Sequence, residues 1–402
     1  MSATSYDHSE RIPGVRFLHT PGPTNIPTEV LNAMHRQPFD HGDPRLDQLI
    51  EACGVGLRRV LGTEKAALYM YASNGHGAWE AMTKNLLAPG QAVLMPITGH
   101  FSEGWARQVE ATGHRVIRTA HREGYPSNPD EIEQVLRADK QHEIIAVFAV
   151  HTETSRGCTN DLRAVRAAID AAHHPALLVA DVISSLAATP FDMDSFGVNV
   201  AIGNSQKGLM GPAGVAFVAV DERAGAVAAN NSTPRYYWDW EFRKAKGNDM
   251  KFCGSVPQNL LFALDAGLTL LFREGMEAVH ARHAMLARAV QVAVDCWARE
   301  GAVSLHCRVP EARSASVTTI DVRAGIDPDA MRAVARERFQ VSVAGALGTQ
   351  RGRAFRIGHL GDMNAPMILG CLGGVEAAMT VCGIPYGRDG VQKAVEYLAA
   401  PR

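Results

Sequence analysis

The sequence predicts an α/β protein with a largely parallel, seven-stranded sheet covered by helices on both faces, followed by a smaller C-terminal α+β domain. From residue 66 onward, short apolar runs alternate with segments of helical periodicity, which is the pattern of parallel strands joined by crossover helices. The length of 402 residues is sufficient for a large core and two domains. We expect an N-terminal arm over residues 1–20, a large domain over 21–275 and a small domain over 276–402.

The N-terminal part is expected to lack regular structure. Residues 1–16 are polar and unpatterned, and residues 17–27 are rich in proline, which cannot donate a backbone hydrogen bond. A helix is expected to begin after Pro27, and a second helical pattern covers residues 46–61. The strands of the large sheet are expected at residues 66–71, 92–95, 116–117, 144–150, 177–180, 200–202 and 215–220.

The remainder of the chain predicts long helices over about residues 256–300 and then a second, smaller sheet. Short apolar runs bounded by turn residues indicate its strands, and a period near 3.6 indicates the helices between them. The strands are expected at residues 316–322, 340–343 and 354–357, with helices at 327–339 and 366–381.

Composition excludes several classes of partner. The 40 basic and 42 acidic residues leave a net charge of −2, which indicates neither a nucleic acid nor an anionic membrane as partner. The seven cysteines are scattered without a C-x-x-C pair, which favours reduced thiols and a cytoplasmic location over a disulfide framework. No signal peptide, membrane span or metal-binding motif is evident, so no metal is expected.

One lysine stands in unusual surroundings. Lys207 follows an apolar run and lies between Gly203 and Gly208, so little side-chain bulk restricts the approach of another molecule. The chain holds only eight lysines against thirty-two arginines, so lysine is not its default surface charge. A desolvated lysine can lose its proton and attack a carbonyl, which arginine cannot do. The ordinary alternative is a lysine that reaches solvent from a tight turn.

A carboxylate upstream supports the reactive role. Residues 176–180 form an unbroken apolar run, typical of a buried strand, and Asp181 follows at its carboxyl end, where ligands of open α/β sheets collect. A buried carboxylate needs a partner, which a protonated pyridine nitrogen can supply. A strand-end Asp followed by a strand-end Lys is the arrangement that binds pyridoxal phosphate.

A third stretch predicts a phosphate site. Residues 69–79 have the pattern of a strand, a glycine-rich turn and a helix, so the backbone N–H groups of Gly75, His76 and Gly77 are expected to be free for a phosphate. A dinucleotide site is the alternative, and the absence of the full G-x-G-x-x-G spacing argues against it.

These stretches together resemble the class V aminotransferases of pyridoxal-phosphate fold type I, and among them the serine–glyoxylate and alanine–glyoxylate aminotransferases. The resemblance runs from residue 18 to about residue 386. The matching stretches are 21–27 (Pro-Gly-Pro-Thr-Asn-Ile-Pro), 74–80 (Asn-Gly-His-Gly-Ala-Trp-Glu), 151–157 (His-Thr-Glu-Thr-Ser-Arg-Gly), Asp181 with Ser184 and Ser185, 205–208 (Ser-Gln-Lys-Gly) and 356–361 (Arg-Ile-Gly-His-Leu-Gly).

The resemblance implies a role for each site residue. Lys207 would bind the cofactor covalently and move a proton between the substrate Cα and the cofactor C4′, and Asp181 would keep the ring nitrogen protonated. Arg356 would bind the substrate carboxylate through its two-pronged guanidinium, beside the turn that holds Gly22. The remaining cofactor contacts implied are Phe101 and Ile183 on the two ring faces, Thr154 near the phenolic oxygen and the lysine, and Asn74, Gly75, His76, Gln206 and the partner subunit's Ser255 around the phosphate.

The expected activity is transamination of a small amino acid, serine or alanine, with glyoxylate as acceptor, in a homodimer with shared active sites. Aspartate or an unusual amine remains open as donor, and a lyase or desulfurase on the same cofactor is the alternative reaction. A desulfurase needs a cysteine nucleophile on a mobile loop, and residues 341–350 contain none. A cofactor-binding protein without turnover is disfavoured by the intact set of Lys207, Asp181 and Arg356.

Four positions depart from the family pattern. Phe252 stands where relatives often have a tyrosine, so one phosphate donor is lost and Ser255 becomes the candidate for the contact across the dimer. Asn74 stands where one branch has serine, and Thr152 and Arg156 also differ. His151 is expected to be structural and not a general base.

Overall fold

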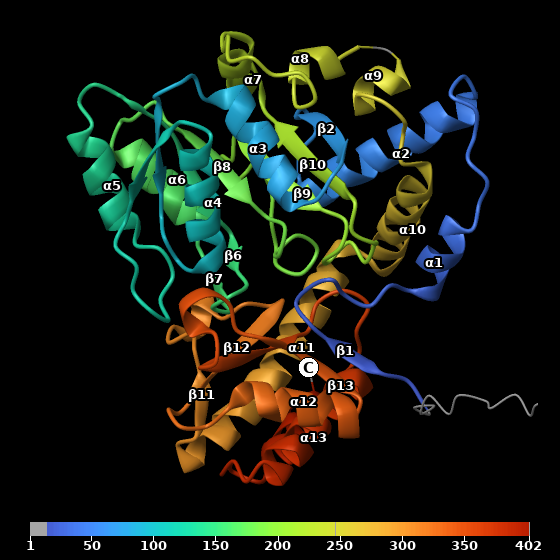
Figure 1. Ribbon diagram of the computed structural model, residues 1–402, viewed down its shortest axis with the longest axis vertical. Helices are drawn as coiled ribbons and strands as arrows, with labels where there is room; N and C mark the ends of the chain where they lie inside the picture. The colour runs from blue at the N-terminus through green and yellow to red at the C-terminus, as the bar shows by residue number, and fades with distance from the viewer. Residues whose placement is uncertain (1–13, 246, 402) are drawn as a thin grey trace, which may run out of the picture.

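The protein contains a seven-stranded sheet and a five-stranded sheet in two parts joined by a long helix (Figure 1). The computed structural model describes residues 14–245 and 247–401. In spatial order the strands of the larger sheet are β2 (Ala67–Ala72), β10 (Val215–Val220), β9 (Val200–Asn204), β8 (Leu177–Asp181), β5 (Ile144–Val150), β3 (Ala92–Met95) and β4 (Arg115–Arg118).

The larger sheet is parallel except for β10, which confirms the sequence prediction of a largely parallel sheet. Strands β9, β8, β5, β3 and β4 pair with one another in parallel in this order, and β10 is antiparallel to both β9 and β2. The chain reaches β10 from β9 through the turn of residues 205–214, because antiparallel neighbours need no crossover helix. Lys207 lies in this turn.

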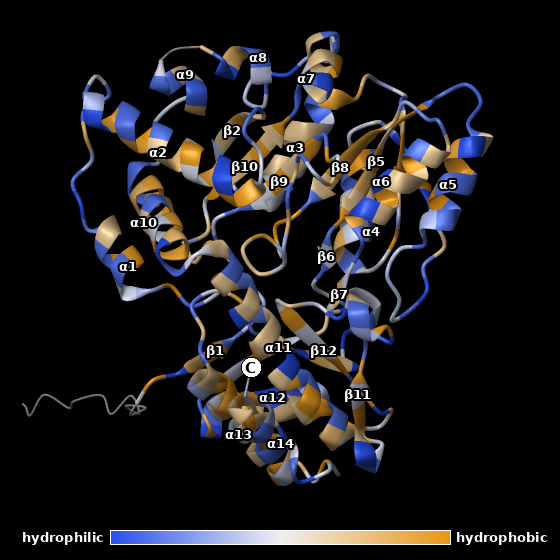
Figure 2. Cartoon of the chain, turned by 180° about the vertical axis from the view of Figure 1, so that it is seen from behind, coloured by the Kyte–Doolittle hydropathy of each residue, from blue (hydrophilic) through white to orange (hydrophobic). Residues whose placement is uncertain are grey.

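Each face of the sheet packs on its own layer of helices. Successive residues of β8 point to opposite faces, with Leu178 in one core and Leu177 in the other. Figure 2 shows β5 and β8 as mostly hydrophobic, as expected of strands buried on both faces. One layer contains α2 (Pro44–Leu61), α5 (Pro129–Ala138), α6 (Leu162–Ala171) and α10 (Gln258–Glu274), and the other contains α3 (Gly75–Leu86), α4 (His100–Ala111) and α7 (Glu222–Ala229).

The smaller sheet forms the second core. Its order is β1 (Phe17–His19), β13 (Val341–Gly345), β14 (Ala354–Gly358), β12 (Val317–Val322) and β11 (Val303–Leu305). Its packing partners are α11 (Met276–Trp297), α12 (Pro328–Arg338), α13 (Ala365–Val381) and α14 (Gly390–Ala399).

The expectation for the N-terminal segment was partly wrong. Residues 17–19 form a strand that pairs in parallel with β13, with Phe17 opposite Val341. These three residues precede the first proline of the segment, Pro21, so their N–H groups remain available for a sheet edge. Residues 20–27 contain neither helix nor strand, and α1 (Thr28–Met34) begins after Pro27 as expected.

Elsewhere the predicted strands and helices are confirmed with bounds that differ by a few residues. The sequence reasoning missed β11, α14 and the short hairpin of β6 (Thr152–Glu153) and β7 (Cys158–Thr159). Residues 1–13 of the expected arm lie outside the described residues. The division near residue 275 remains a prediction, and Gly275 separates α10 from α11.

Two general features follow from the described part of the chain. None of its helices has the length and apolar character needed to cross a membrane. No group of three or more His, Cys, Asp or Glu side chains in residues 14–245 and 247–401 is placed to hold a metal ion.

Candidate active site

A cavity of about 220 Å³ lies at the carboxyl ends of the parallel strands. Strands β5 and β8, the turns that follow β2 and β9, and the start of α4 after β3 all contribute to it, which is where open α/β sheets bind ligands. Its lining consists of Gly22, Asn74, Gly75, His76, Trp79, Phe101, Val150, Thr152, Asp181, Ile183, Ser184, Gln206 and Lys207. Nine of the twelve site residues predicted from the sequence are therefore in one cavity, and Thr154, Ser255 and Arg356 are not among its lining residues.

Lys207 lies in the turn after β9 and is buried, with 9% of its surface exposed. Its amine donates a hydrogen bond to the backbone carbonyl of Pro21. Burial, together with the positive charge of Arg356 and against the opposing charge of Asp181, lowers the pKa of Lys207 to about 8. The amine therefore releases a proton far more easily than a surface lysine does.

Asp181 is the last residue of β8 and is 5% exposed. Its Oδ1 accepts a hydrogen bond from the backbone N–H of Ile183 at 2.8 Å, and its Oδ2 accepts one from the indole Nε1–H of Trp79 at 2.8 Å. Burial raises the pKa of Asp181 to about 6, and the two hydrogen bonds act in the opposite direction. A buried carboxylate of this kind favours a cationic partner, because a positive charge compensates for the lost water.

The helix α3 begins at the cavity, but two of its backbone donors are already used. The Asn74 side chain caps the helix, and its Oδ1 accepts hydrogen bonds from the N–H groups of His76 at 3.1 Å and Gly77 at 3.3 Å. The expectation that all three N–H groups of this turn are free was therefore wrong, since Asn is a strong N-cap residue. A Cβ on Gly75 would lie 2.5 Å from Cδ1 of Ile183, so any larger residue at this position would have to displace the Ile183 side chain.

Gln206, beside the reactive lysine, carries an unsatisfied polar group. Its Oε1 is buried and has no hydrogen-bond partner among the described residues. A buried amide without a partner is costly, so this position is suited to a polar ligand. Phe101 and Ile183 supply half-buried apolar surface to the same cavity.

Arg356 lies on β14 and approaches the cavity from the smaller sheet. Its Nε donates to the carbonyl of Gly345 at 2.9 Å, and its Nη1 donates to the carbonyl of Thr154 at 3.1 Å. Its Nη2 has no hydrogen-bond partner in the described part of the chain and so remains for a ligand. Burial lowers the pKa of Arg356 to about 10, which still leaves it charged at neutral pH. Thr154 thus contacts Arg356 through its backbone, while Thr152 lines the cavity.

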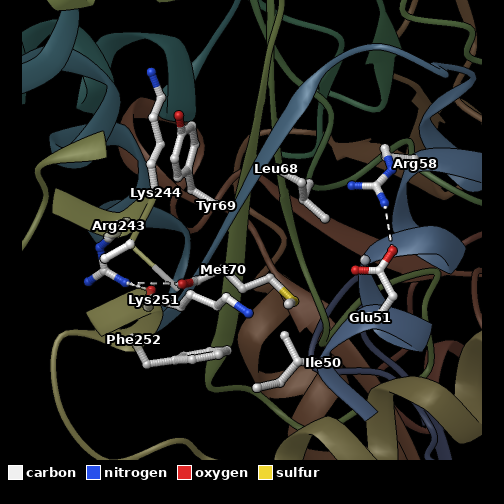
Figure 3. A pocket seen from close by; sticks show the side chains of 12 residues that line it. Ile50, Glu51, Arg58, Leu68, Tyr69, Met70, Arg243, Lys244, Lys251 and Phe252 are labelled. Atoms are coloured by element: carbon white, nitrogen blue, oxygen red, sulfur yellow. Dashed lines mark hydrogen bonds and ion pairs between the residues drawn. The ribbon is translucent and has the colours of Figure 1, made fainter. Parts of the chain in front are cut away.

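Ser255 is exposed and lies outside the cavity of its own chain. Phe252, three residues earlier, is 2% exposed and lines a separate hollow of about 160 Å³ between α2, β2 and the α8–α9 segment (Figure 3). Arg243 in this hollow donates to the carbonyls of Tyr237, Met70 and Lys251. Its guanidinium therefore connects this segment to β2. The segments α8 and α9 comprise Trp240–Arg243 and Asn248–Phe252.

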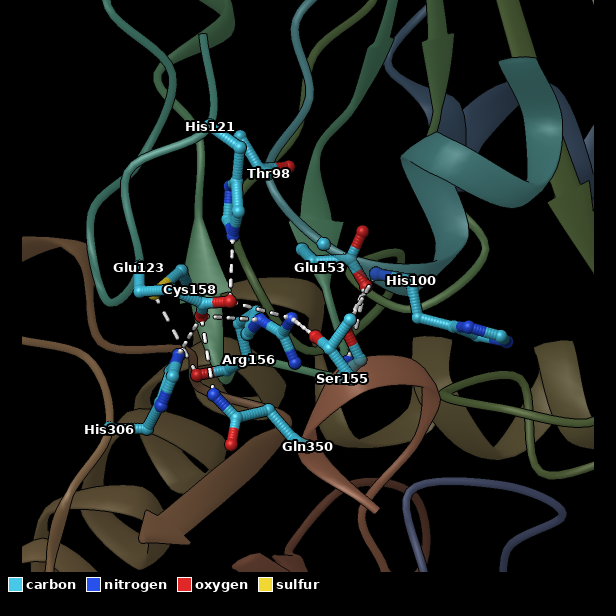
Figure 4. A network of polar contacts seen from close by, with 12 residues as sticks. Thr98, His100, His121, Glu123, Glu153, Ser155, Arg156, Cys158, His306 and Gln350 are labelled. Carbon is cyan, nitrogen blue, oxygen red and sulfur yellow. Dashed lines mark hydrogen bonds and ion pairs between the residues drawn. The ribbon is translucent and has the colours of Figure 1, made fainter. Parts of the chain in front are cut away.

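Arg156, one of the four positions that depart from the family pattern, belongs to a polar network with Glu123 (Figure 4). Its guanidinium lies 3.1 Å from Oε2 of Glu123 and donates to Oε1 of Glu123 at 3.2 Å. It also donates to Thr349, between β13 and β14 of the smaller sheet, at 3.1 Å. The side chain thus links the loop after β5 to the connection between these two strands.

Several contributors to the site were missed from the sequence. Glu153 is fully buried and accepts hydrogen bonds from the N–H groups of Phe101 and Ser102 at the start of α4. This contact fixes the end of the helix that carries Phe101. Val150, Thr152, Ser184 and Trp79 line the cavity, and the one available signal for Trp79 was its place within the glycine-rich motif.

The fold and the cavity are those of an α/β enzyme with a buried lysine of lowered pKa at the carboxyl edge of its sheet. The family described as "Aminotransferase class-V" matches residues 16–350. The chain belongs to the class V aminotransferases, and this membership implies pyridoxal phosphate as cofactor.

Similar proteins agree over nearly the full length. The chain is 37% identical to a serine–glyoxylate aminotransferase of Methylorubrum extorquens, covering 96% of this chain and 97% of the relative. It is 36% identical to an L-aspartate–glyoxylate aminotransferase of Paracoccus denitrificans, covering 94% and 95% respectively. A solved alanine–glyoxylate aminotransferase from Nostoc sp. superimposes with a TM-score of 0.82 at 26% identity, over 94% of this chain and 100% of that one.

Proposed function

We propose that this chain is a pyridoxal-phosphate-dependent aminotransferase that transfers the amino group of a small amino acid, serine or alanine, to glyoxylate. The observation that carries the proposal is one cavity that holds both a buried lysine with a lowered pKa and a buried strand-end aspartate, Lys207 and Asp181. Each of the two side chains matches one part of the cofactor. The aldehyde of the cofactor reacts with the amine, and its basic ring nitrogen pairs with the carboxylate.

The residues present fit this cofactor. Asp181 would hold the proton on the ring nitrogen, and Phe101 and Ile183 would cover the ring faces. Gln206, through its amide N–H₂ group, Gly75 and His76 are the candidates around the phosphate, and the N–H groups that Asn74 now caps would turn to it. The bound cofactor supplies an electron-withdrawing ring that stabilises the negative charge left at the substrate Cα after deprotonation.

The chain's own groups would then divide the work. Lys207 would accept the proton from the substrate Cα and hold it for return to the product, and burial of its amine suits it to this exchange. Arg356 binds the substrate carboxylate through Nη2, while the carbonyls of Gly345 and Thr154 hold its other nitrogens. The turn that contains Gly22 closes over the lysine and limits the space available to a substrate.

Glyoxylate is proposed as acceptor because it carries a single carboxylate, which the guanidinium of Arg356 can bind. Arg156, in the loop after β5, is held by Glu123 and Thr349 and is therefore not free to bind a second substrate carboxylate. The similarity to enzymes named for serine and glyoxylate supports the same choice. Aspartate is the second candidate donor, favoured by the 36% identity to the L-aspartate–glyoxylate enzyme.

We further propose a cytoplasmic homodimer in which Ser255 contacts the phosphate of the partner subunit. Support comes from the exposure of Ser255 and its absence from the cavity of its own chain.

A half-reaction screen tests the function. Purified protein is loaded with pyridoxal phosphate, and the visible absorbance of the bound cofactor is followed while serine, alanine, aspartate or an amine without a carboxylate is added. Loss of the band with serine or alanine, restored by glyoxylate, is the expected result. Absence of any band in the loaded protein would refute the cofactor assignment, and a better response to 2-oxoglutarate would refute glyoxylate as acceptor.

A further inference from the structure

Trp79 makes a hydrogen bond that neither the family resemblance nor the proposed roles include. It lies on α3, is 2% exposed and lines the cavity. Its indole Nε1–H donates to Oδ2 of Asp181 at 2.8 Å. The other oxygen of Asp181 accepts from the backbone N–H of Ile183, so the carboxylate is held from two directions.

The indole is itself held in place by an aromatic column. Its ring stacks on that of Trp105, with ring centroids 5.4 Å apart and an interplanar angle of 13°. The ring of Trp105 stacks in turn on Phe148, with centroids 4.8 Å apart and an angle of 20°. The ring centroid of His76 lies 4.5 Å from that of Trp79. Rotation of the indole would disturb α3, α4 and β5 together, so the Nε1–H direction is fixed by packing.

An indole N–H can donate a hydrogen bond but cannot accept one. It therefore stabilises the ionised form of Asp181 much more than the protonated form. Burial and the negative charge of Glu153 raise the pKa of Asp181, while Lys207, Ile183 and Trp79 lower it. Among these opposing groups, Trp79 is the side chain in direct contact with the carboxylate.

We propose that Trp79 is a positioning residue that orients the carboxylate of Asp181 and keeps it ionised, so that Asp181 can hold a proton on the ring nitrogen of the cofactor. The last part of this inference rests on the proposed function. The orientation and ionisation of Asp181 are properties of the cofactor-free protein and can be measured without it.

The chain offers a closely matched control. Trp105 belongs to the same column and is fully buried, and its Nε1 has no hydrogen-bond partner among the described residues. Trp79→Phe and Trp105→Phe thus remove the same atoms from adjacent rings. Only the first removes a hydrogen bond to Asp181.

The first experiment follows the carboxyl ¹³C signal of Asp181 in cofactor-free protein between pH 4 and 9, assigned by its loss in Asp181→Asn. The wild-type midpoint is expected near pH 6. Trp79→Phe should move the midpoint upward by about one pH unit, as expected for a lost hydrogen bond to a charged group. Trp105→Phe should leave it within a few tenths of a unit. Equal midpoints in the two tryptophan variants would overturn the inference.

The second experiment uses pyridoxal phosphate labelled with ¹⁵N in the ring. In Trp79→Phe the ring-nitrogen signal should move toward that of unprotonated pyridine, and cofactor binding should weaken roughly tenfold. Trp105→Phe should retain the wild-type signal. If the wild type binds no cofactor while the ¹³C shift is seen, the proposed function fails and the role of Trp79 toward Asp181 stands.

Circular dichroism and thermal melting establish that each variant is folded. Should Trp79→Phe be unfolded, Trp79→Leu measured against Trp105→Leu provides the same comparison. A ring-nitrogen signal and a midpoint that change equally at both positions would show that the column acts only through packing.

Discussion

The side-chain amine of Lys207 donates a hydrogen bond to the backbone carbonyl of Pro21, although 186 residues separate the two in the chain. The contact places the turn of residues 21–23 directly against the lysine. A Cβ on the next residue, Gly22, would lie 2.5 Å from the Lys207 Nζ. The proposed substrate turn and the proposed reactive amine are therefore a single packed unit.

Gly22→Ala should reduce turnover more than tenfold. Gly22 has φ of 129°, a conformation that alanine rarely adopts, and its Cβ would displace the Lys207 side chain. Steady-state activity together with a thermal melt measures the effect. Gly90→Ala is the control, since Gly90 also has a positive φ, of 81°, but nothing lies within 4 Å of its Cβ. It should lose about 1 kcal/mol of stability and keep its activity. Equal activity losses in both variants would exclude a specific contact with Lys207.

Lys207→Ala should abolish transamination, because no other lysine is among the described residues that line the cavity to bind the cofactor covalently or return the proton. Borohydride reduction of the loaded wild type followed by peptide mapping should place the adduct on Lys207. The comparison residues are Lys244 and Lys251, which lie in the separate hollow. An adduct on either would contradict the assignment.

Arg356→Lys should raise the KM of α-carboxylate substrates by one to two orders of magnitude and leave the cofactor absorbance intact. A lysine ammonium cannot donate in parallel to Gly345, Thr154 and a substrate carboxylate as the guanidinium can. Initial rates over a range of serine and glyoxylate concentrations measure the change. Arg156→Lys serves as control, and its KM for glyoxylate should stay within a few-fold of wild type.

Mixing two inactive variants tests the contact across the dimer. If Ser255 reaches the partner's phosphate, a heterodimer of Ser255→Glu and Lys207→Ala contains one site with both lesions and one site with neither. Activity should therefore return to the mixture after subunit exchange. Exchange demonstrated by mass spectrometry without any recovered activity would place the contact within one chain.

Stability should fall as the pH drops below 6.5. His19, His151, His283 and His359 are at most 3% exposed, and burial lowers their pKa values to about 4, 4, 4 and 3. The unfolded chain binds protons near pH 6.5 while the folded chain does not, so each histidine favours unfolding by roughly 1.4 kcal/mol per pH unit between 6.5 and about 4. The raised pKa of Asp181 opposes this trend below pH 6.

Urea denaturation at pH 7.5, 6.5 and 5.5 measures this slope. His359→Gln should reduce the slope of the free energy of unfolding against pH by the contribution of about one proton. His359 is held neutral in the folded protein between Thr318 and the carbonyl of Ala315. A free energy of unfolding that stays constant from pH 6.5 to 5.5 would contradict the assignment of these histidines as neutral in the folded state.

The sequence by itself determined the framework of the protein. The strands β3, β5 and β10 were predicted with their observed bounds, because continuous apolar runs flanked by turns are local signals of doubly buried strands. The carboxyl ends of the runs predicted at residues 177–180 and 200–202 also indicated where Asp181 and Lys207 would lie, since parallel strands bring these ends to one edge. The residue types of the site and the edge of the sheet where it lies could therefore be predicted from short segments of the sequence.

The tertiary structure alone decided which partners those residues have. Phe17 pairs with Val341, Trp79 donates to Asp181 from 102 residues away, and Arg156 is held by Glu123. Asn74 caps the helix whose first N–H groups were predicted from the sequence to be free for a phosphate. A periodic pattern shows that a side chain is buried, but hydrogen bonds and ion pairs depend on which elements become neighbours and on the direction of each side chain. Those directions are set by the packing of the whole core.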